Sequence, residues 1–147
     1  MENNDIKPST IMLIAGGAVL FISTFLDWIS IDGGEFFGDF GANAWETDAF
    51  GLLGIICAVI GLIIGGGVAA TQFGNVSMPD KILGFNHDQL HLILGAEALL
   101  ITFGLFFRGD LGIGLILGLL ASIAIVVGAF MDLRAADGGG DAAPTQF

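Results

Sequence analysis

The sequence predicts an all-α integral membrane protein in which four transmembrane helices form one bundle. Hydrophobic residues make up 54% of the 147 positions and charged residues only 13%. A soluble domain carries roughly a quarter charged residues, so this composition is typical of a chain in lipid. Four apolar windows lie at about 10–30, 50–72, 89–107 and 111–133. Each is long enough to cross a hydrocarbon core about 30 Å thick.

The windows differ in the charge that they carry. Asp27 stands near the end of the first window, and Glu97 stands close to the middle of the third. The second window and residues 111–131 of the fourth contain no charged residue. Short loops join the windows, so residues 1–134 are predicted to form a single domain. Residues 135–147 are acidic and rich in Gly and Ala, and they are predicted to form a disordered tail.

The basic residues predict the orientation in the membrane. Four spans place both termini on one side together with Lys7, Lys81 and Arg134, whereas Arg108 lies on the other side. Basic loops tend to face the cytoplasm, so the protein is predicted to be a multi-pass protein of the cytoplasmic membrane with both termini inside the cell. The net charge of -11 leaves no basic patch for phosphate, which argues against a nucleic-acid partner.

Two pairs of predicted helices align with each other. Residues 13–17 align with residues 92–96, and residues 58–65 align with residues 121–128, on apolar and small side chains. This pattern suggests a duplicated two-helix hairpin, which would be a parallel repeat. Apolar segments also align by chance, so the alternative of no duplication stays open.

Small residues four positions apart mark packing faces on the second and fourth helices. They are Gly54 with Ala58, Gly61 with Gly65, and the series Gly114, Gly118 and Ser122. Helices in lipid associate through close backbone approach, which small residues permit. These faces are predicted to pack either inside the bundle or between copies in an oligomer, and the spacing does not separate the two.

Glu97 is the sharpest candidate for a functional side chain. A carboxylate near the bilayer midplane costs roughly 3 kcal/mol on insertion scales, so it is expected to face the protein interior and to find a partner there. Ser122, at a matching depth on the fourth helix, is the predicted hydrogen-bond partner. Two interpretations stay open, a neutral acid that joins helices or a site linked to protons or cations.

The loop between the first two helices is acidic and aromatic. Its candidate docking residues are Asp32, Glu35, Asp39, Trp45, Glu46 and Asp48. One interpretation puts the aromatic rings at the membrane interface and the acids in water. The alternative is a docking surface for a cationic ligand, a divalent ion or a protein partner.

His87 and His91 stand one helical turn apart, a spacing that can present two imidazoles to a metal. The competing interpretation is structural, because Asn86 and Gln89 predict a capping box at the start of the third helix. The sequence offers no third ligand nearby, so neither a metal nor a cofactor is expected.

Phe25, Leu26, Asp27 and Trp28 stand at the outer end of the first helix, before a glycine-bearing loop. This segment resembles small four-helix actinobacterial integral membrane proteins, which typically read Phe-Leu-Pro-Trp there. Asp27 stands where those proteins have proline. The resemblance implies a prokaryotic cytoplasmic membrane and implies no particular activity.

These features favour a small structural or accessory membrane protein that associates with itself or with a larger membrane complex in the lipid bilayer. The alternative is a small oligomeric transporter or channel-like protein with a proton- or cation-linked Glu97. Cys57 is the only cysteine, and the serines of the predicted spans have no histidine near them in this topology. The chain is therefore not expected to be an enzyme.

Overall fold

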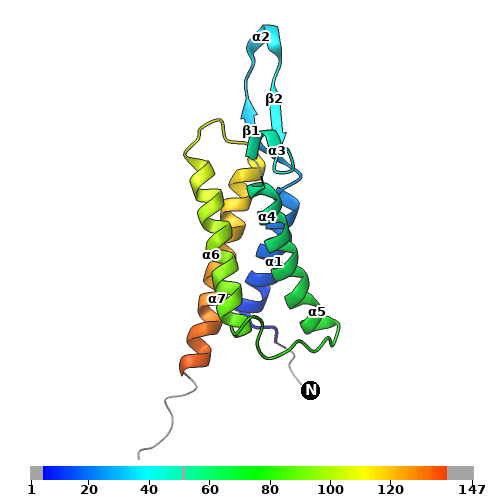
Figure 1. Cartoon of the computed structure of the whole chain (residues 1–147), viewed down its shortest axis with the longest axis vertical. Helices are drawn as coiled ribbons and strands as arrows, with labels where there is room; N and C mark the ends of the chain where they lie inside the picture. The colour runs from blue at the N-terminus through cyan, green and yellow to red at the C-terminus, as the bar shows by residue number, and fades with distance from the viewer. Residues whose placement is uncertain (1–4, 51, 139–147) are drawn as a thin grey trace, which may run out of the picture.

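The computed structural model describes residues 5–50 and 52–138 and is mostly helical (68%). Within these residues, three helical stretches are long and apolar enough to cross a membrane: Leu53–Phe73, α6 (His87–Phe106) and α7 (Ile113–Gly138). A shorter apolar helix, α1 (Pro8–Ser23), packs against α7. Figure 1 shows the start of α1 and the end of α7 at the same end of the molecule.

α1 ends earlier than the predicted helix at 10–30. It begins at Pro8, whose fixed φ suits the first turn of a helix. At its other end, the hydroxyls of Ser23 and Thr24 donate to backbone carbonyls one turn earlier, at 2.7 and 2.6 Å. Trp28 Nε1 then donates to the Ser23 carbonyl at 2.8 Å. These bonds satisfy carbonyls at the helix end, so the chain leaves the helix at this point.

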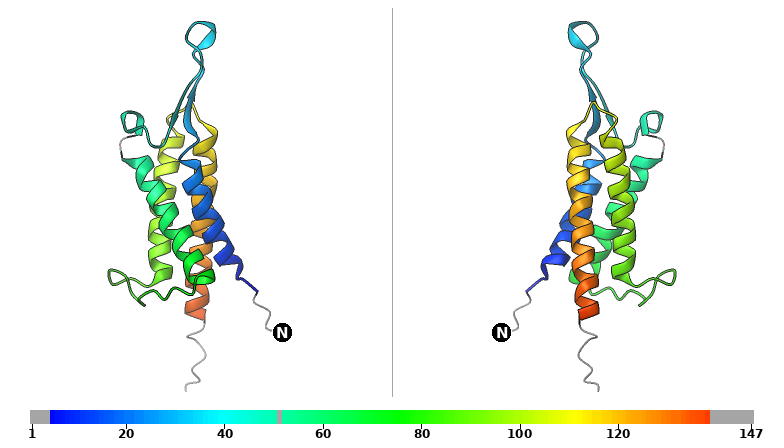
Figure 2. Two further views of the ribbon diagram at one scale, coloured as in Figure 1. Left: turned by 90° about the vertical axis from the view of Figure 1, so that its right-hand side faces the viewer. Right: turned by 90° about the vertical axis from the view of Figure 1, so that its left-hand side faces the viewer.

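A β-hairpin follows α1, which corrects the all-α prediction. β1 (Asp27–Ile31) pairs antiparallel with β2 (Phe40–Asn43), and the short helix α2 (Gly34–Phe37) lies between them. Gly34 and Gly38 have positive φ on either side of this turn, a conformation that glycine adopts without strain. Figures 1 and 2 show the hairpin projecting beyond the ends of the helices.

Hydrogen bonds fix the base of the hairpin to the helical part of the molecule. The Ser30 N–H donates to the Asp110 carbonyl and the Gly112 N–H donates to the Trp28 carbonyl, each at 2.9 Å. The Ala44 N–H donates to the end of α1 at 3.1 Å. The hairpin is therefore joined both to α1 and to the loop between α6 and α7.

The stretch Leu53–Phe73 corresponds to the second predicted helix, so we call it the second long stretch, and it contains a π-helical turn. After α3 (Thr47–Phe50), the chain runs through α4 (Leu53–Gly61), the π-helical η1 (Leu62–Gly66) and α5 (Gly67–Phe73). A π-turn is a recognised cause of helix bending. Figure 1 shows α5 diverging from α6 beyond this turn, so α4 and α6 are closest near the hairpin.

The last two helices lie close to the predicted spans. The Asn86 N–H donates to Gln89 Oε1 at 3.3 Å before α6, which confirms the predicted capping box. α7 continues to Gly138, so residues 135–138 are helical rather than part of a tail. The remainder of the predicted tail, residues 139–147, lies outside the described residues.

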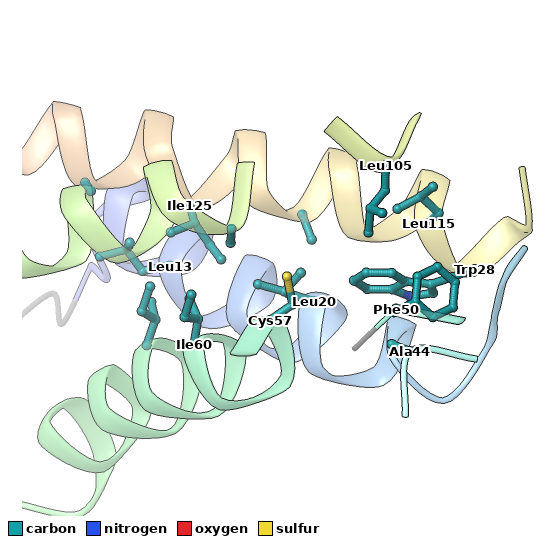
Figure 3. Packing of buried hydrophobic residues seen from close by; sticks show 14 residues of the cluster. Leu13, Leu20, Trp28, Ala44, Phe50, Cys57, Ile60, Leu105, Leu115 and Ile125 are labelled. Carbon is teal, nitrogen blue, oxygen red and sulfur yellow. The ribbon is translucent and has the colours of Figure 1, made fainter. Parts of the chain in front are cut away.

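The hydrophobic core runs along the contacts between the helices (Figure 3). Its fully buried side chains include Leu20, Trp28, Cys57 and Ile125. Trp28 is the largest of them, and its ring meets Phe50 edge-on with the centroids 5.8 Å apart. Trp28 therefore extends the core from the helices to the base of the hairpin.

The duplicated hairpin stays a hypothesis. In the first helix pair, Gly17 packs against Gly65. Gly128, which corresponds to Gly65 in the alignment, packs against Ser9 and Met12 of α1 rather than against α6. The two helix pairs thus use corresponding glycines for different contacts.

Candidate functional site

Glu97 lies on the outer surface of α6, near the middle of this 20-residue helix. The buried positions of α6 are Gly95, Ala98, Thr102 and Leu105, at spacings of three and four residues. This period defines the inward face of the helix, and Glu97 falls outside it. The expectation that Glu97 faces the interior is therefore wrong, because other residues occupy the inward positions and Glu97 is exposed.

An apolar groove of about 320 Å³ lies between α4 and α6 beside Glu97. Its lining includes Ile56, Val59 and Ile63 from the second long stretch, and Leu94 from α6. Every lining residue except Glu97 is apolar. In a bilayer, a carboxyl group on such a surface meets either lipid or a hydrogen-bonding group from outside the chain, and lipid is the costly alternative.

Ser122 takes Thr102 as its partner, and not Glu97 as predicted. Thr102 Oγ1 and Ser122 Oγ lie 3.1 Å apart in the buried contact between α6 and α7. Thr102 Oγ1 also lies 2.9 Å from the Ala98 carbonyl, and Ser122 Oγ lies 2.8 Å from the Leu119 carbonyl. Each hydroxyl has one proton, so one hydroxyl donates across the interface while the other donates within its own helix. The pair is thus a polar link between two helices.

Thr102 is not among the residues that the sequence marks as candidates. The signal that would have found it is its place in the series of small residues Gly95, Ala98 and Thr102. Such a series marks the face of a membrane helix that approaches a neighbour closely, and a hydroxyl on that face is available for a bond between helices.

The glycines of the second predicted helix lie at contacts within the chain. A Cβ added to Gly61 would lie 2.8 Å from the Gly17 carbonyl oxygen, and one added to Gly65 would lie 2.9 Å from the Ala18 nitrogen. Gly54 meets the backbone of Ala44 in the same way. Ala58 is buried beside them. These residues hold the backbone of the second long stretch against α1 and the base of the hairpin.

Gly114 and Gly118 make room for Trp28 and the end of α1. A Cβ added to Gly114 would lie 2.8 Å from Trp28 Cδ1 and 2.7 Å from the Ser23 carbonyl oxygen. A Cβ added to Gly118 would lie 3.1 Å from Ser23 Oγ. Of the two roles that the spacing left open, the structure places these glycines in packing within one chain.

The acidic residues of the outer loop fall into two groups. Asp32, Glu35 and Asp39 belong to the far end of the hairpin, residues 32–39, which we call the hairpin tip. Glu46 and Asp48 lie at the base, beside and within α3. All five residues are exposed. The structure thus divides the predicted docking residues between the tip and the base.

Trp45 belongs to the base of the hairpin. Its Nε1 donates to Thr24 Oγ1 at 3.2 Å, and its ring lies against Phe25 with the centroids 5.4 Å apart. These contacts tie the residue that follows β2 to the end of α1. Trp45 therefore has a structural role, and the three carboxylates of the hairpin tip are the stronger docking candidates.

His87 and His91 make separate contacts at the start of α6. His87 Nε2 donates to the Pro79 carbonyl at 2.8 Å, and His91 Nδ1 is buried with no hydrogen-bond partner among the described residues. Their ring centroids are 6.5 Å apart. Within residues 5–50 and 52–138, no group of three or more His, Cys, Asp or Glu side chains is placed to hold a metal ion.

No protein-family model, curated protein or solved structure matches this chain. The geometry leaves two candidate interaction sites on the outside of the molecule. One is the acidic hairpin tip, and the other is Glu97 on the outer surface of α6.

Proposed function

We propose that the protein is a four-span integral membrane protein that acts as a structural or accessory component, associating with itself and with a larger complex of the cytoplasmic membrane. The three long apolar helices support membrane insertion. α1 has 16 residues, about 24 Å of helix, and packs along α7. Because α1 packs along α7, we count it as the fourth span of the bilayer. Four spans put both termini on one side, and the basic residues on that side favour the cytoplasm.

The observation that carries this role is the hairpin tip. Asp32, Glu35 and Asp39 stand on a projection whose base is fixed by hydrogen bonds to the helical part (Figure 2). The sequence contains no Lys, Arg or His between Lys7 and Lys81, so no basic side chain of the same loop offsets their charge. A fixed acidic projection attracts the basic surface of another protein and orients it during association.

Contacts inside the chain favour this role over transport. α1 meets the second long stretch in backbone contact at Gly17 and Gly65, and α6 meets α7 through Thr102 and Ser122. Protein atoms fill both contacts, and the groove between α4 and α6 is lined by apolar side chains apart from Glu97, so a water-filled path would form more readily between copies of the chain. The alternative function, a small oligomeric transporter or channel-like protein, would place Glu97 in such a path.

Co-purification from the native membrane in mild detergent tests the proposal. The tip variant carries Asp32→Asn, Glu35→Gln and Asp39→Asn, and the control variant carries Glu46→Gln, Asp48→Asn and Asp137→Asn. Each variant removes three carboxylates, so the two have the same net charge. A heterologous membrane protein is expected to stay bound to the wild type and to the control, and to be depleted about tenfold with the tip variant.

Two results would contradict the accessory role. One is recovery of the wild type without any heterologous partner, and the other is equal partner recovery with the tip variant and the control. Proton or cation flux in liposomes, present with the purified wild type and lost with Glu97→Gln, would support the transport alternative instead.

A further inference from the structure

The outer face of α6 carries a regular series of exposed residues, which we call the α6 seam. It consists of Ile93, Glu97, Leu100 and Gly104 of α6 and of Phe107, the C-cap residue that follows the helix. Their separations alternate between four and three residues, which keeps them on a single stripe of the helix. Two helices pack along such a stripe in a coiled coil. Figure 1 shows α6 at the edge of the helical part, with one side turned away from the other helices.

Packing within the chain does not require a glycine at position 104. A Cβ added to Gly95 would lie 2.7 Å from the Ile125 side chain, whereas one added to Gly104 would meet no atom within 4 Å. Glycine inside a helix costs about 1 kcal/mol relative to alanine. Gly104 stands between Leu100 and Phe107, each 72% exposed. A gap between two large exposed side chains allows a second helix to approach closely.

Glu97 provides a second and independent observation. The hydroxyls of Ser23, Thr24, Thr102 and Ser122 are buried and hydrogen-bonded within the chain. Glu97 instead lies exposed beside the apolar groove toward α4. A carboxyl group in hydrocarbon needs a hydrogen-bonding partner, and among the described residues none donates to Glu97, so a second chain is the source that we consider.

Apolar grooves flank the α6 seam on both sides. The groove toward α4, about 320 Å³, includes Leu94 and Glu97. The groove toward α7, about 370 Å³, includes Leu100 and Phe103 of α6 with Leu119 of α7. α6 therefore lies between two apolar grooves, and side chains of a second helix that packs along the α6 seam can enter them.

We propose that two copies of the chain pair along the α6 seam, with Glu97 of one copy hydrogen-bonded to Glu97 of the other. The proposal rests on the membrane insertion and self-association included in the proposed function. Copies inserted in the same orientation have parallel helices related by a two-fold axis, and equal seam positions then face each other. Gly104 faces Gly104, which lets the backbones approach at that level. The O–H of a protonated carboxyl group donates a hydrogen bond to an oxygen of the other carboxyl group.

A second copy suits this face better than a helix bearing Lys or Arg. A basic partner would require an ionised Glu97 and a buried cation, whose desolvation offsets much of their attraction. A carboxyl pair that holds at least one proton carries one negative charge at most and avoids a buried cation. The second copy also presents its own Gly104 and its own flanking grooves at the matching levels.

Disulfide cross-linking of the full chain in lipid vesicles tests the arrangement. All variants carry Cys57→Ala, which removes the native thiol. Leu100→Cys places a thiol on the α6 seam, and Ile22→Cys, an exposed position of α1, is the control. A mild oxidant is expected to convert most of the Leu100→Cys chain to a covalent dimer and little of the control. A Leu100→Cys chain that cross-links no better than the control would overturn the parallel pairing.

Dimer affinity, measured by dilution into excess lipid, tests the two residues. Glu97→Gln keeps a hydrogen-bonding group and is expected to stay within about threefold of the wild type, whereas Glu97→Leu is expected to weaken the dimer about tenfold. Gly104→Leu is expected to weaken it at least as much. Its control is Gly66→Leu, another exposed helical glycine, where an added Cβ would meet only the Leu62 side chain at 3.9 Å.

The outcomes separate this proposal from the accessory function. Both seam positions are exposed, so each variant is expected to keep the helix content of the wild type by circular dichroism. Unchanged dimer affinity in Glu97→Leu and Gly104→Leu would overturn the proposal. The proposal would also be overturned if the wild type were monomeric and bound a different membrane protein that no longer bound to the Glu97→Leu variant. A stable α6 dimer without a hairpin-dependent partner would count against the accessory function alone.

Discussion

Gly17 and Gly65 face each other across the contact between α1 and η1, with backbone against backbone. A Cβ added to Gly17 would lie 2.5 Å from the Gly65 Cα and 2.8 Å from the Gly61 carbonyl oxygen. Side-chain carbons do not come this close to backbone atoms, so the contact requires glycine at these positions. It fixes α1 against the second long stretch at the level of the π-turn.

Gly17→Ala is therefore expected to destabilise the folded chain by about 1–3 kcal/mol, because the neighbouring backbone atoms cannot rotate away from the added methyl group. Gly104→Ala is the control, since its Cβ would meet open space and alanine raises helix propensity by about 1 kcal/mol. Unfolding of the monomer in mixed micelles, followed by circular dichroism, measures both. Equal stability of Gly17→Ala and the wild type would contradict the backbone contact.

Trp28 and Trp45 have different environments and report separately on the hairpin base. Trp28 is fully buried, whereas Trp45 is 40% exposed. In Trp45→Phe, the remaining Trp28 is expected to emit at shorter wavelength and to resist a neutral water-soluble quencher. In Trp28→Phe, the remaining Trp45 is expected to be quenched several times more strongly. Steady-state fluorescence compares the two variants, and the reverse order of quenching would be inconsistent with a buried Trp28.

Thr102 and Ser122 are expected to be energetically coupled. Thr102→Val and Ser122→Ala each remove one partner, and the double variant completes a cycle. Such pairs in membrane bundles contribute about 0.6 kcal/mol on average, so we expect a coupling energy of that size from unfolding measurements. Glu97→Gln combined with Ser122→Ala is expected to be additive. A coupling energy between Ser122 and Glu97 would instead support the hydrogen bond between these two residues that the sequence predicts.

The long helices were predictable because their signal is local. Leu53–Phe73, α6 and α7 each combine length with high apolar content, and the capping box at Asn86 depends on residues of a single turn. The hairpin was not predictable in this way. Residues 27–31 continue the apolar composition of α1, and they leave the helix because of pairing with residues 40–43 and with the loop before α7. These contacts are distant in sequence.

The outward position of Glu97 shows a second limit of sequence reasoning. The cost of a carboxylate in lipid argued for an inward position, but Ala98 and Gly95 occupy the inward face. One residue along an α-helix turns the side chain by about 100°, so Glu97 points well away from Ala98. The spacing of the small residues decides which side of α6 faces the other helices. Only a partner from another molecule would then lower the free-energy cost of the Glu97 carboxyl group in lipid.

His87 ties the segment before α6 to the helix through the 2.8 Å bond from its Nε2 to the Pro79 carbonyl. Lys81 lies exposed in this segment. Loss of one hydrogen bond worth about 1 kcal/mol raises the open population roughly fivefold, so His87→Ala is expected to speed tryptic cleavage after Lys81 by about that factor. His91→Ala leaves the Pro79 bond in place and is expected to stay within about twofold of the wild type. Limited proteolysis, with trypsin added on the side of the membrane where the termini lie, measures the rates of cleavage after Lys81. If His91→Ala accelerated cleavage as much as His87→Ala, the Pro79 bond could not be what holds this segment.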